Sequence, residues 1–138
     1  MMEINYLAIV VSGIAAMVIG GLWYGPLFGK QWMALMGMNC DPASITPEQK
    51  KQMYKSYAFM FVGSLVMAFV FSTSLAAFGA VGVGMALQGA FWMWLGFFVP
   101  VLMGSVLWEM KPWKLFFINA GHYLVSLGII ALILTLWR

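Results

Sequence analysis

Three polar residues interrupt an apolar stretch near the C-terminus, and of all the residues in this chain they are the best placed to do chemistry. Asn119, His122 and Ser126 are spaced i, i+3 and i+7, so they share one face of a helix. His122 follows Pro112 by ten residues, which places it about 15 Å along that helix, near the centre of a bilayer. A histidine there could transfer protons or contact a ligand. The simpler interpretation is a neutral histidine hydrogen-bonded to a neighbouring helix.

A second set of candidate residues lies in an aromatic-rich run. Gln88 is followed by Trp92 and Trp94, whose spacing of two puts them on different faces of a helix. Pro100 removes a backbone donor, so we expect a kink before it. The aromatic rings either face lipid and neighbouring helices or line a pocket for an apolar or cationic ligand. Such a pocket would need Gln88 or His122 nearby.

The charged and nucleophilic residues do not form a recognisable catalytic group. One histidine, one cysteine and four acidic residues are dispersed, with no nucleophile beside a base and no spacing typical of a metal site. We therefore expect a protein that is not an enzyme and has no metal or other cofactor. Cys40 has no partner for an internal disulfide. One catalytic alternative is left, an active site that forms only when the chain folds. Its residues would be Asp41, Glu48 and Glu109, which we place on the same side of the membrane.

The elements that would position these residues are membrane-spanning helices. Of the 138 residues, 64% are hydrophobic and only 8% are charged, too few to cover the surface of a soluble domain. A spanning helix needs about 20 apolar residues, and helices satisfy their own backbone groups in lipid. The sequence predicts an all-α membrane protein, a single domain of residues 1–138 with four transmembrane helices in a compact bundle. The predicted helices are approximately residues 5–24, 56–78, 83–108 and 112–137.

The connections between these helices have distinct signals. Gly25 and Pro26 are predicted to end the first helix, which leaves residues 27–43 as an interfacial segment. Thr46 and Gln49 flank Pro47 in the pattern of a capping box, so a helix should restart there, before the membrane. A tight turn is predicted at residues 79–82.

Basic residues are distributed unevenly between alternate loops, with Arg138 alone on one side. Since cytoplasmic loops carry an excess of Lys and Arg, loops 1 and 3 are predicted to be cytoplasmic and both termini periplasmic or extracellular. These residues flank apolar runs and form no basic stripe, so we expect no nucleic-acid partner. The six basic residues of loops 1 and 3 are Lys30, Lys50, Lys51, Lys55, Lys111 and Lys114.

An aromatic motif marks the place where the first helix should reach the cytoplasmic interface. Trp and Tyr favour that level because their rings are apolar while their N–H and O–H groups need polar partners. The motif is either an ordinary aromatic belt or a platform for lipid or another ligand at the broken helix. Its residues are Trp23, Tyr24, Pro26, Phe28 and Trp32.

On these residues the chain resembles the small bacterial membrane proteins grouped as domain of unknown function 1761. The resemblance spans nearly the whole chain. It implies a four-helix domain of the bacterial inner membrane and brings no assigned reaction or catalytic residues. It rests on Gly21, Trp23, Tyr24, Pro26, Phe28 and Trp32, with support from Trp94, Gly96 and Phe97 and from Glu109 to Pro112.

Small residues recur at helical spacing in the first and last spans. Ser12, Ala16 and Gly20 are four residues apart, and Gly121 and Gly128 are seven apart. Such rows let membrane helices approach closely. They face either another helix of the chain or a second subunit, so a homo-oligomer is one possible assembly.

Two functions fit these observations. The first is a non-enzymatic membrane protein that binds lipid, a small molecule or protein partners within the membrane. The alternative is a small transporter or channel that uses the polar face of Asn119, His122 and Ser126. Small multidrug transporters have similar length but depend on a membrane-embedded carboxylate, and here only His122 could take that role.

Overall fold

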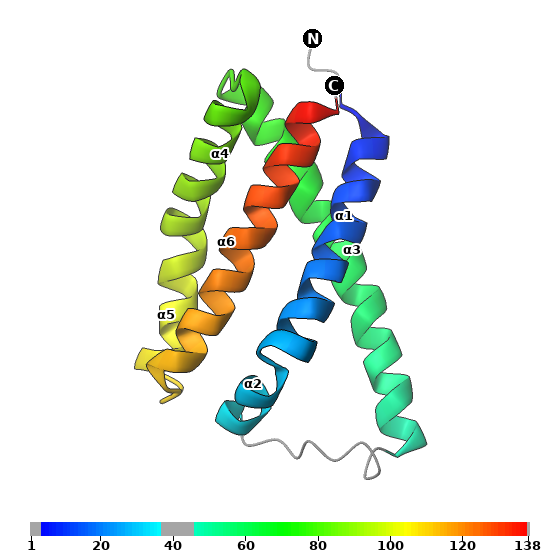
Figure 1. Ribbon diagram of the computed structural model, residues 1–138, viewed down its shortest axis with the longest axis vertical. Helices are drawn as coiled ribbons and strands as arrows, with labels where there is room; N and C mark the ends of the chain where they lie inside the picture. The colour runs from blue at the N-terminus through cyan, green and yellow to red at the C-terminus, as the bar shows by residue number, and fades with distance from the viewer. Residues whose placement is uncertain (1–3, 37–45, 138) are drawn as a thin grey trace.

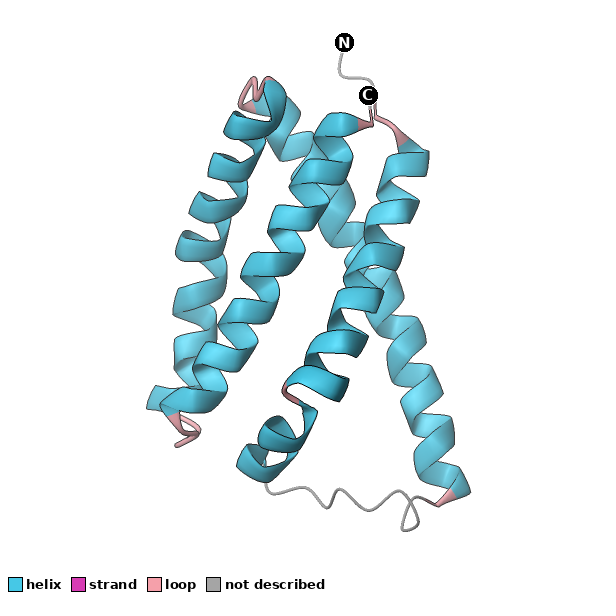
Figure 2. Cartoon of the chain, viewed as in Figure 1, coloured by secondary structure: helices cyan, strands magenta, loops and turns pink. Residues whose placement is uncertain are grey.

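The chain folds into helices joined by short turns, and the computed structural model describes residues 4–36 and 46–137 (Figure 1). Figure 2 shows these described residues as helix and loop, without a strand. Two of the helical segments, written η1 and η3, are short stretches of π-helix. The elements in chain order are α1 (Tyr6–Leu22), η1 (Trp23–Leu27), α2 (Gly29–Met36), α3 (Pro47–Ala77), α4 (Gly82–Met93), η3 (Trp94–Phe98), α5 (Val99–Leu107) and α6 (Trp113–Leu136).

Four of the helical stretches are long and apolar enough to cross a bilayer. They agree with the four predicted spans, which confirms the all-α membrane class. The largest difference is at the second span, whose helix begins at Pro47, before the predicted start of the span at residue 56. The four stretches are Tyr6–Leu27, Pro47–Ala77, Gly82–Leu107 and Trp113–Leu136.

The predicted capping box starts α3. The Thr46 hydroxyl accepts a hydrogen bond from the backbone N–H of Gln49 at 3.2 Å, and the Gln49 side chain accepts one from the backbone N–H of Thr46 at 3.0 Å. Pro47 occupies the first turn, where its missing N–H costs nothing. These contacts satisfy two otherwise free donors at the start of the helix.

The helix α6 is the centre of the fold. Figure 1 shows it between α1 on one side and α4 with α5 on the other, while α1 also packs against α3. Leu127, Ile130 and Ala131 of α6 are fully buried, and they join the same core as Phe71 of α3 and Ala90 of α4. Residues carried by α6 are therefore the ones most enclosed by neighbouring helices.

The predicted end of the first helix at Gly25 and Pro26 is wrong. The chain continues through both residues as the π-helix η1 and turns only at Phe28, whose φ of −124° and ψ of 6° leave the helical region. A π turn is wider than an α turn, so it accommodates the proline ring and the missing N–H. The short helix α2 then occupies part of the predicted interfacial segment.

The predicted turn at residues 79–82 is confirmed. Gly79 and Gly82 have φ values of 67° and 81°, a left-handed conformation that glycine adopts without steric cost. At the same end of the molecule the Asn5 side chain donates a hydrogen bond to the carbonyl of Trp137 at 2.8 Å, which joins the two ends of the chain.

Several sequence predictions fall outside the described residues. They concern the last part of the predicted interfacial segment, residues 37–43, and the individual residues Cys40, Asp41 and Arg138.

Candidate functional site

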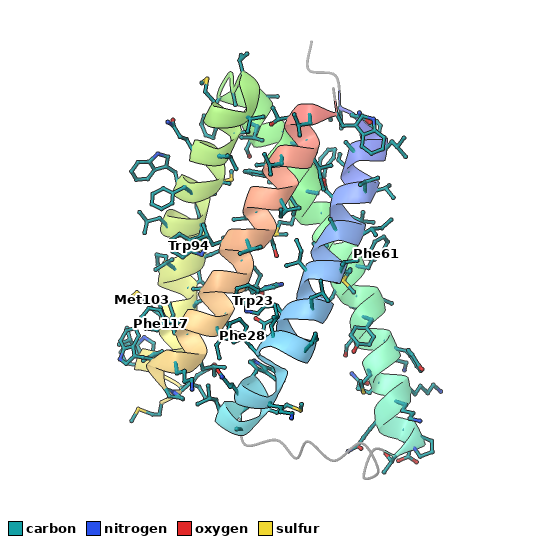
Figure 3. The ribbon with its side chains drawn as sticks, viewed as in Figure 1. Trp23, Phe28, Phe61, Trp94, Met103 and Phe117 are labelled. Atoms are coloured by element: carbon teal, nitrogen blue, oxygen red, sulfur yellow. The ribbon has the colours of Figure 1, made fainter. Side chains whose placement is uncertain are left out.

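Two tryptophans from opposite sides hydrogen-bond to the backbone of α6. The indole N–H of Trp23, from η1, donates to the carbonyl of Ile118 at 2.9 Å. The indole N–H of Trp94, from η3, donates to the carbonyl of Ala120 at 2.7 Å. Figure 3 shows the two residues on the elements that flank α6. The two bonds fix one stretch of α6 against both neighbours, and Asn119 lies in the middle of that stretch.

Both tryptophans begin a π-helical turn. The carbonyl of Trp23 accepts from the N–H of Phe28, and the carbonyl of Trp94 accepts from the N–H of Val99, each five residues ahead. Single π turns inside α-helices are often found at functional sites. The second turn lies immediately before Pro100, where the sequence predicts a kink. The helical distortion that proline causes there takes the form of this turn.

The sequence contains a signal for this pair of turns that the predictions missed. Each turn begins with Trp, any residue and Gly: Trp23-Tyr24-Gly25 in η1 and Trp94-Leu95-Gly96 in η3. Pro26 follows Gly25 directly inside η1, whereas Pro100 lies four residues after Gly96, beyond the end of η3. The same three-residue pattern thus begins both turns, and in each turn its tryptophan donates a hydrogen bond to α6.

The predicted aromatic motif and the predicted polar face of α6 meet in one hydrogen bond. The phenol of Tyr24 donates to the side-chain oxygen of Asn119 at 2.7 Å. Tyr24 also packs edge to face against Trp32 of α2, with ring centroids 5.6 Å apart. The motif is therefore more than a belt at the lipid surface, because it joins η1 and α2 to the central helix.

His122 lies one helical turn further along α6, inside an aromatic enclosure. It is only 9% exposed. Its ring centroid lies 5.0 Å from that of Tyr24, 4.9 Å from that of Tyr123 and 6.4 Å from that of Trp23. Gly20 of α1 lies next to the ring, since a Cβ built at this glycine would be in van der Waals contact with the histidine Nε2 at 3.5 Å.

The prediction that His122 bonds to a neighbouring helix is wrong. Its Nε2 shares a hydrogen bond of 3.4 Å with the hydroxyl of Ser126, one turn along the same helix. Its Nδ1 has no hydrogen-bond partner among the described residues. The i, i+4 spacing within α6 makes the first contact possible. The polar groups of the nearby Trp23 and Tyr24 of η1 donate instead to Ile118 and Asn119.

A pocket of about 460 Å³ opens between α2, α5 and α6, at the end of the molecule opposite the chain termini. The Tyr24–Asn119 pair forms part of its wall, and both residues are half-buried. Its remaining polar members come from α5, α6 and the turn between these helices. The lining residues are Tyr24, Trp32, Met36, Leu102, Ser105, Glu109, Lys111, Leu115, Asn119 and Tyr123.

Comparison with known proteins identifies the family. The family model described as protein of unknown function (DUF1761) matches residues 7–135. The chain belongs to this family. The match includes η1, η3 and every residue that lines the pocket. Neither the curated proteins nor the solved structures compared with the chain gave a match.

Some candidates predicted from the sequence lie away from the site of this DUF1761 protein. Gln88 is exposed on α4, and Trp92 is 64% exposed. Trp94 points instead to α6, so the two tryptophans do occupy different faces as their spacing predicts. Within the described ranges, His, Cys, Asp and Glu form no group of three that could hold a metal ion.

The small residues of the DUF1761 chain pack within the chain. Ser12 and Ala16 are buried, and Gly20 faces His122 across the contact between α1 and α6. Gly121 accommodates the ring of Trp23, because a Cβ at this glycine would lie 3.1 Å from the indole. Gly128 has no such neighbour within 4 Å. The small residues therefore let α1 and η1 approach α6 closely where Trp23 and His122 make their contacts.

Proposed function

We propose that this DUF1761 protein is a non-enzymatic membrane protein that binds a lipid in the pocket between α2, α5 and α6. One observation carries the proposal: the hydrogen-bonded Tyr24–Asn119 pair forms a polar wall in a pocket whose other members include apolar side chains. A few fixed polar groups in a mainly apolar cavity are typical of small-molecule sites.

The lining of the pocket matches an amphipathic ligand. Leu102 and Leu115 come from the spanning part of α5 and α6, where acyl chains would lie. Glu109 and Lys111 come from the turn that ends these spans, where a polar headgroup would lie. The pocket volume also falls within the range of about 300–1,000 Å³ that is usual for ligand sites.

The Asn119→Ala substitution is expected to weaken binding of phospholipid to the purified protein by about fivefold to tenfold. It removes the acceptor of the Tyr24 hydrogen bond and the amide that lines the pocket, a loss of about 1 to 1.5 kcal/mol. Native mass spectrometry of the detergent-solubilised protein, titrated with phospholipid, measures the bound fraction directly.

Gln88→Ala is the matched control, because it removes an exposed amide on α4 that does not line the pocket. It should leave lipid binding unchanged. Equal affinity of the Asn119→Ala and Gln88→Ala proteins for phospholipid would contradict the proposed site.

Transport or conduction along the polar face of α6 is the alternative function. One observation favours it: His122 is buried, and its Nδ1 has no hydrogen-bond partner among the described residues. Intramembrane ionisable groups often mark ion or proton pathways. Flux measurements on the protein reconstituted in liposomes distinguish the two functions. We expect no solute or proton flux, and a flux abolished by His122→Ala would establish transport in place of simple binding.

We also propose that the pocket end of the molecule faces the cytoplasm of a bacterial cell, with both termini on the other side of the inner membrane. The helix α2, the first turns of α3, the α5–α6 turn and the first turn of α6 lie at that end, opposite the termini (Figure 1). These segments carry six of the seven basic residues, which favours the cytoplasmic side. The six are Lys30, Lys50, Lys51, Lys55, Lys111 and Lys114.

Single-cysteine labelling of intact cells tests this orientation. In a Cys40→Ser background, Ala80→Cys should react with a membrane-impermeant maleimide added from outside, whereas Lys114→Cys should react only after the membrane is permeabilised. The two positions lie at opposite ends of the spans. The reverse pattern of labelling would overturn the orientation and leave the pocket facing outward.

A further inference from the structure

A pair of opposite charges lines the proposed lipid pocket. Glu109 and Lys111 both come from the turn between α5 and α6 and both line the cavity. They are the only charged residues among its lining side chains in the described part of the chain. A pocket that presents one carboxylate and one ammonium favours a ligand that carries both a cation and an anion, because each charge then finds its complement.

The backbone of this turn holds the two charged residues in place. Met110, between them, has a φ of 59°, a left-handed conformation that costs a residue with a side chain about 1–2 kcal/mol. The N–H of Lys111 donates to the carbonyl of Ser105 at 3.0 Å, which ties the turn back to α5. Strained conformations of this kind persist where the surrounding structure imposes them, and they are frequent at ligand sites.

The polar groups of the pocket lie at two levels. At the turn the Lys111 ammonium is the donor for an anionic group, whereas the Asn119 amide, whose oxygen is already bonded to Tyr24, and the Tyr123 hydroxyl lie about 9 Å and 15 Å along α6 from its start at Trp113. For a cationic group the pocket offers the Glu109 carboxylate. It also offers the rings of Tyr24 and Trp32, and aromatic rings attract ammonium groups.

We infer that the pocket selects a zwitterionic phospholipid headgroup, a phosphate joined to an amine, over an anionic one. The phosphate lies by Lys111 and the amine by Glu109 and the aromatic rings. A lysine alone would favour anionic lipids, and Glu109 opposes them by repulsion. The inference rests on the proposed lipid-binding function and specifies the class of headgroup.

The test compares four lipids that have the same acyl chains: phosphatidylethanolamine, phosphatidylcholine, phosphatidylglycerol and diacylglycerol. Each is titrated into the full-length detergent-solubilised protein, and binding is measured by native mass spectrometry. We expect both zwitterionic lipids to bind about fivefold more tightly than phosphatidylglycerol. A fivefold ratio corresponds to about 1 kcal/mol, the upper end of the contribution of a charge pair that includes an exposed residue such as Glu109.

Two variants that each remove one charge test whether the headgroup selectivity comes from the pocket. Glu109→Gln should reduce the preference for zwitterionic over anionic lipid to less than about twofold. Lys111→Gln should weaken all three phosphate-containing lipids by about threefold to fivefold and leave diacylglycerol unchanged. Glu48→Gln and Lys114→Gln are matched controls that remove exposed charges outside the pocket, and they should change neither result.

The possible outcomes separate this inference from the function on which it rests. Binding of phosphatidylglycerol as tightly as the zwitterionic lipids, or a preference that survives Glu109→Gln, overturns the headgroup assignment while lipid binding stands. Failure of all four lipids to bind overturns the proposed function as well.

Discussion

Gly29→Ala is expected to weaken phospholipid binding by more than tenfold and to lower the free energy of unfolding by about 1–2 kcal/mol. A Cβ at residue 29 would lie 2.5 Å from the backbone oxygen of Tyr24 and 3.1 Å from its carbonyl carbon. The chain must therefore move at the junction of η1 and α2, because backbone atoms cannot rotate out of the way as a side chain does. Tyr24 moves with it, so its hydrogen bond to Asn119 is lost, and α2 shifts together with Trp32 and Met36, which also line the pocket.

Gly21→Ala is the matched control, since it changes the same residue type in α1, where an added Cβ meets nothing within 4 Å. It should leave binding intact and raise stability by up to about 1 kcal/mol, the usual gain from replacing glycine in a helix. Unfolding in detergent and lipid titration measure the two effects. A Gly29→Ala protein that behaves like Gly21→Ala would show that the close packing at this junction does not support the pocket.

Trp23→Phe and Trp94→Phe are expected to destabilise the protein by about 1 kcal/mol each, and by about 2 kcal/mol together. Each substitution removes an indole hydrogen bond to α6 and part of the ring that packs there. Interhelical hydrogen bonds in membranes contribute about 0.6 kcal/mol on average and at most about 1.7 kcal/mol. The carbonyls of Ile118 and Ala120 belong to α6 and keep their helical hydrogen bonds, so no buried group is left without a partner.

Unfolding of each variant by SDS in mixed micelles measures this loss. Trp92→Phe is the matched control on the same span, because its side chain is 64% exposed and donates no hydrogen bond to the described residues. It should change stability by less than about 0.5 kcal/mol. If Trp92→Phe were as destabilising as Trp94→Phe, the indole bonds would not be what fixes α6.

The fold follows closely from the sequence because the membrane restricts the choices. Runs of about 20 apolar residues with few charges allow only spanning helices, so the class and the four spans could be predicted. The start of α3 could also be predicted, because the capping box depends only on residues close together in sequence: Thr46, Pro47 and Gln49. The helix end predicted at Gly25 and Pro26 was wrong because a π turn tolerates proline. Residue propensity alone does not distinguish a π turn from a helix end.

The site was only partly predictable. The spacing of Asn119, His122 and Ser126 identified one inward face of α6, on which His122 and Ser126 are buried and Asn119 is half-buried. Their partners were not predictable, since the Tyr24–Asn119 bond depends on the register between two helices that are far apart in sequence. Gln88 is exposed on α4 and does not line the pocket, because a polar residue in a span can face outward.

Photocrosslinking of bound lipid tests the central claim most directly. The purified protein is loaded with a phospholipid that carries a diazirine at the head of one acyl chain, irradiated, and digested for mass spectrometry. We predict adducts on α2 and on the segment from α5 to the first half of α6, around Leu102 and Leu115, and their loss in Gly29→Ala. Adducts confined to lipid-facing residues of α3, such as Phe59 and Phe69, would contradict lipid binding in this pocket.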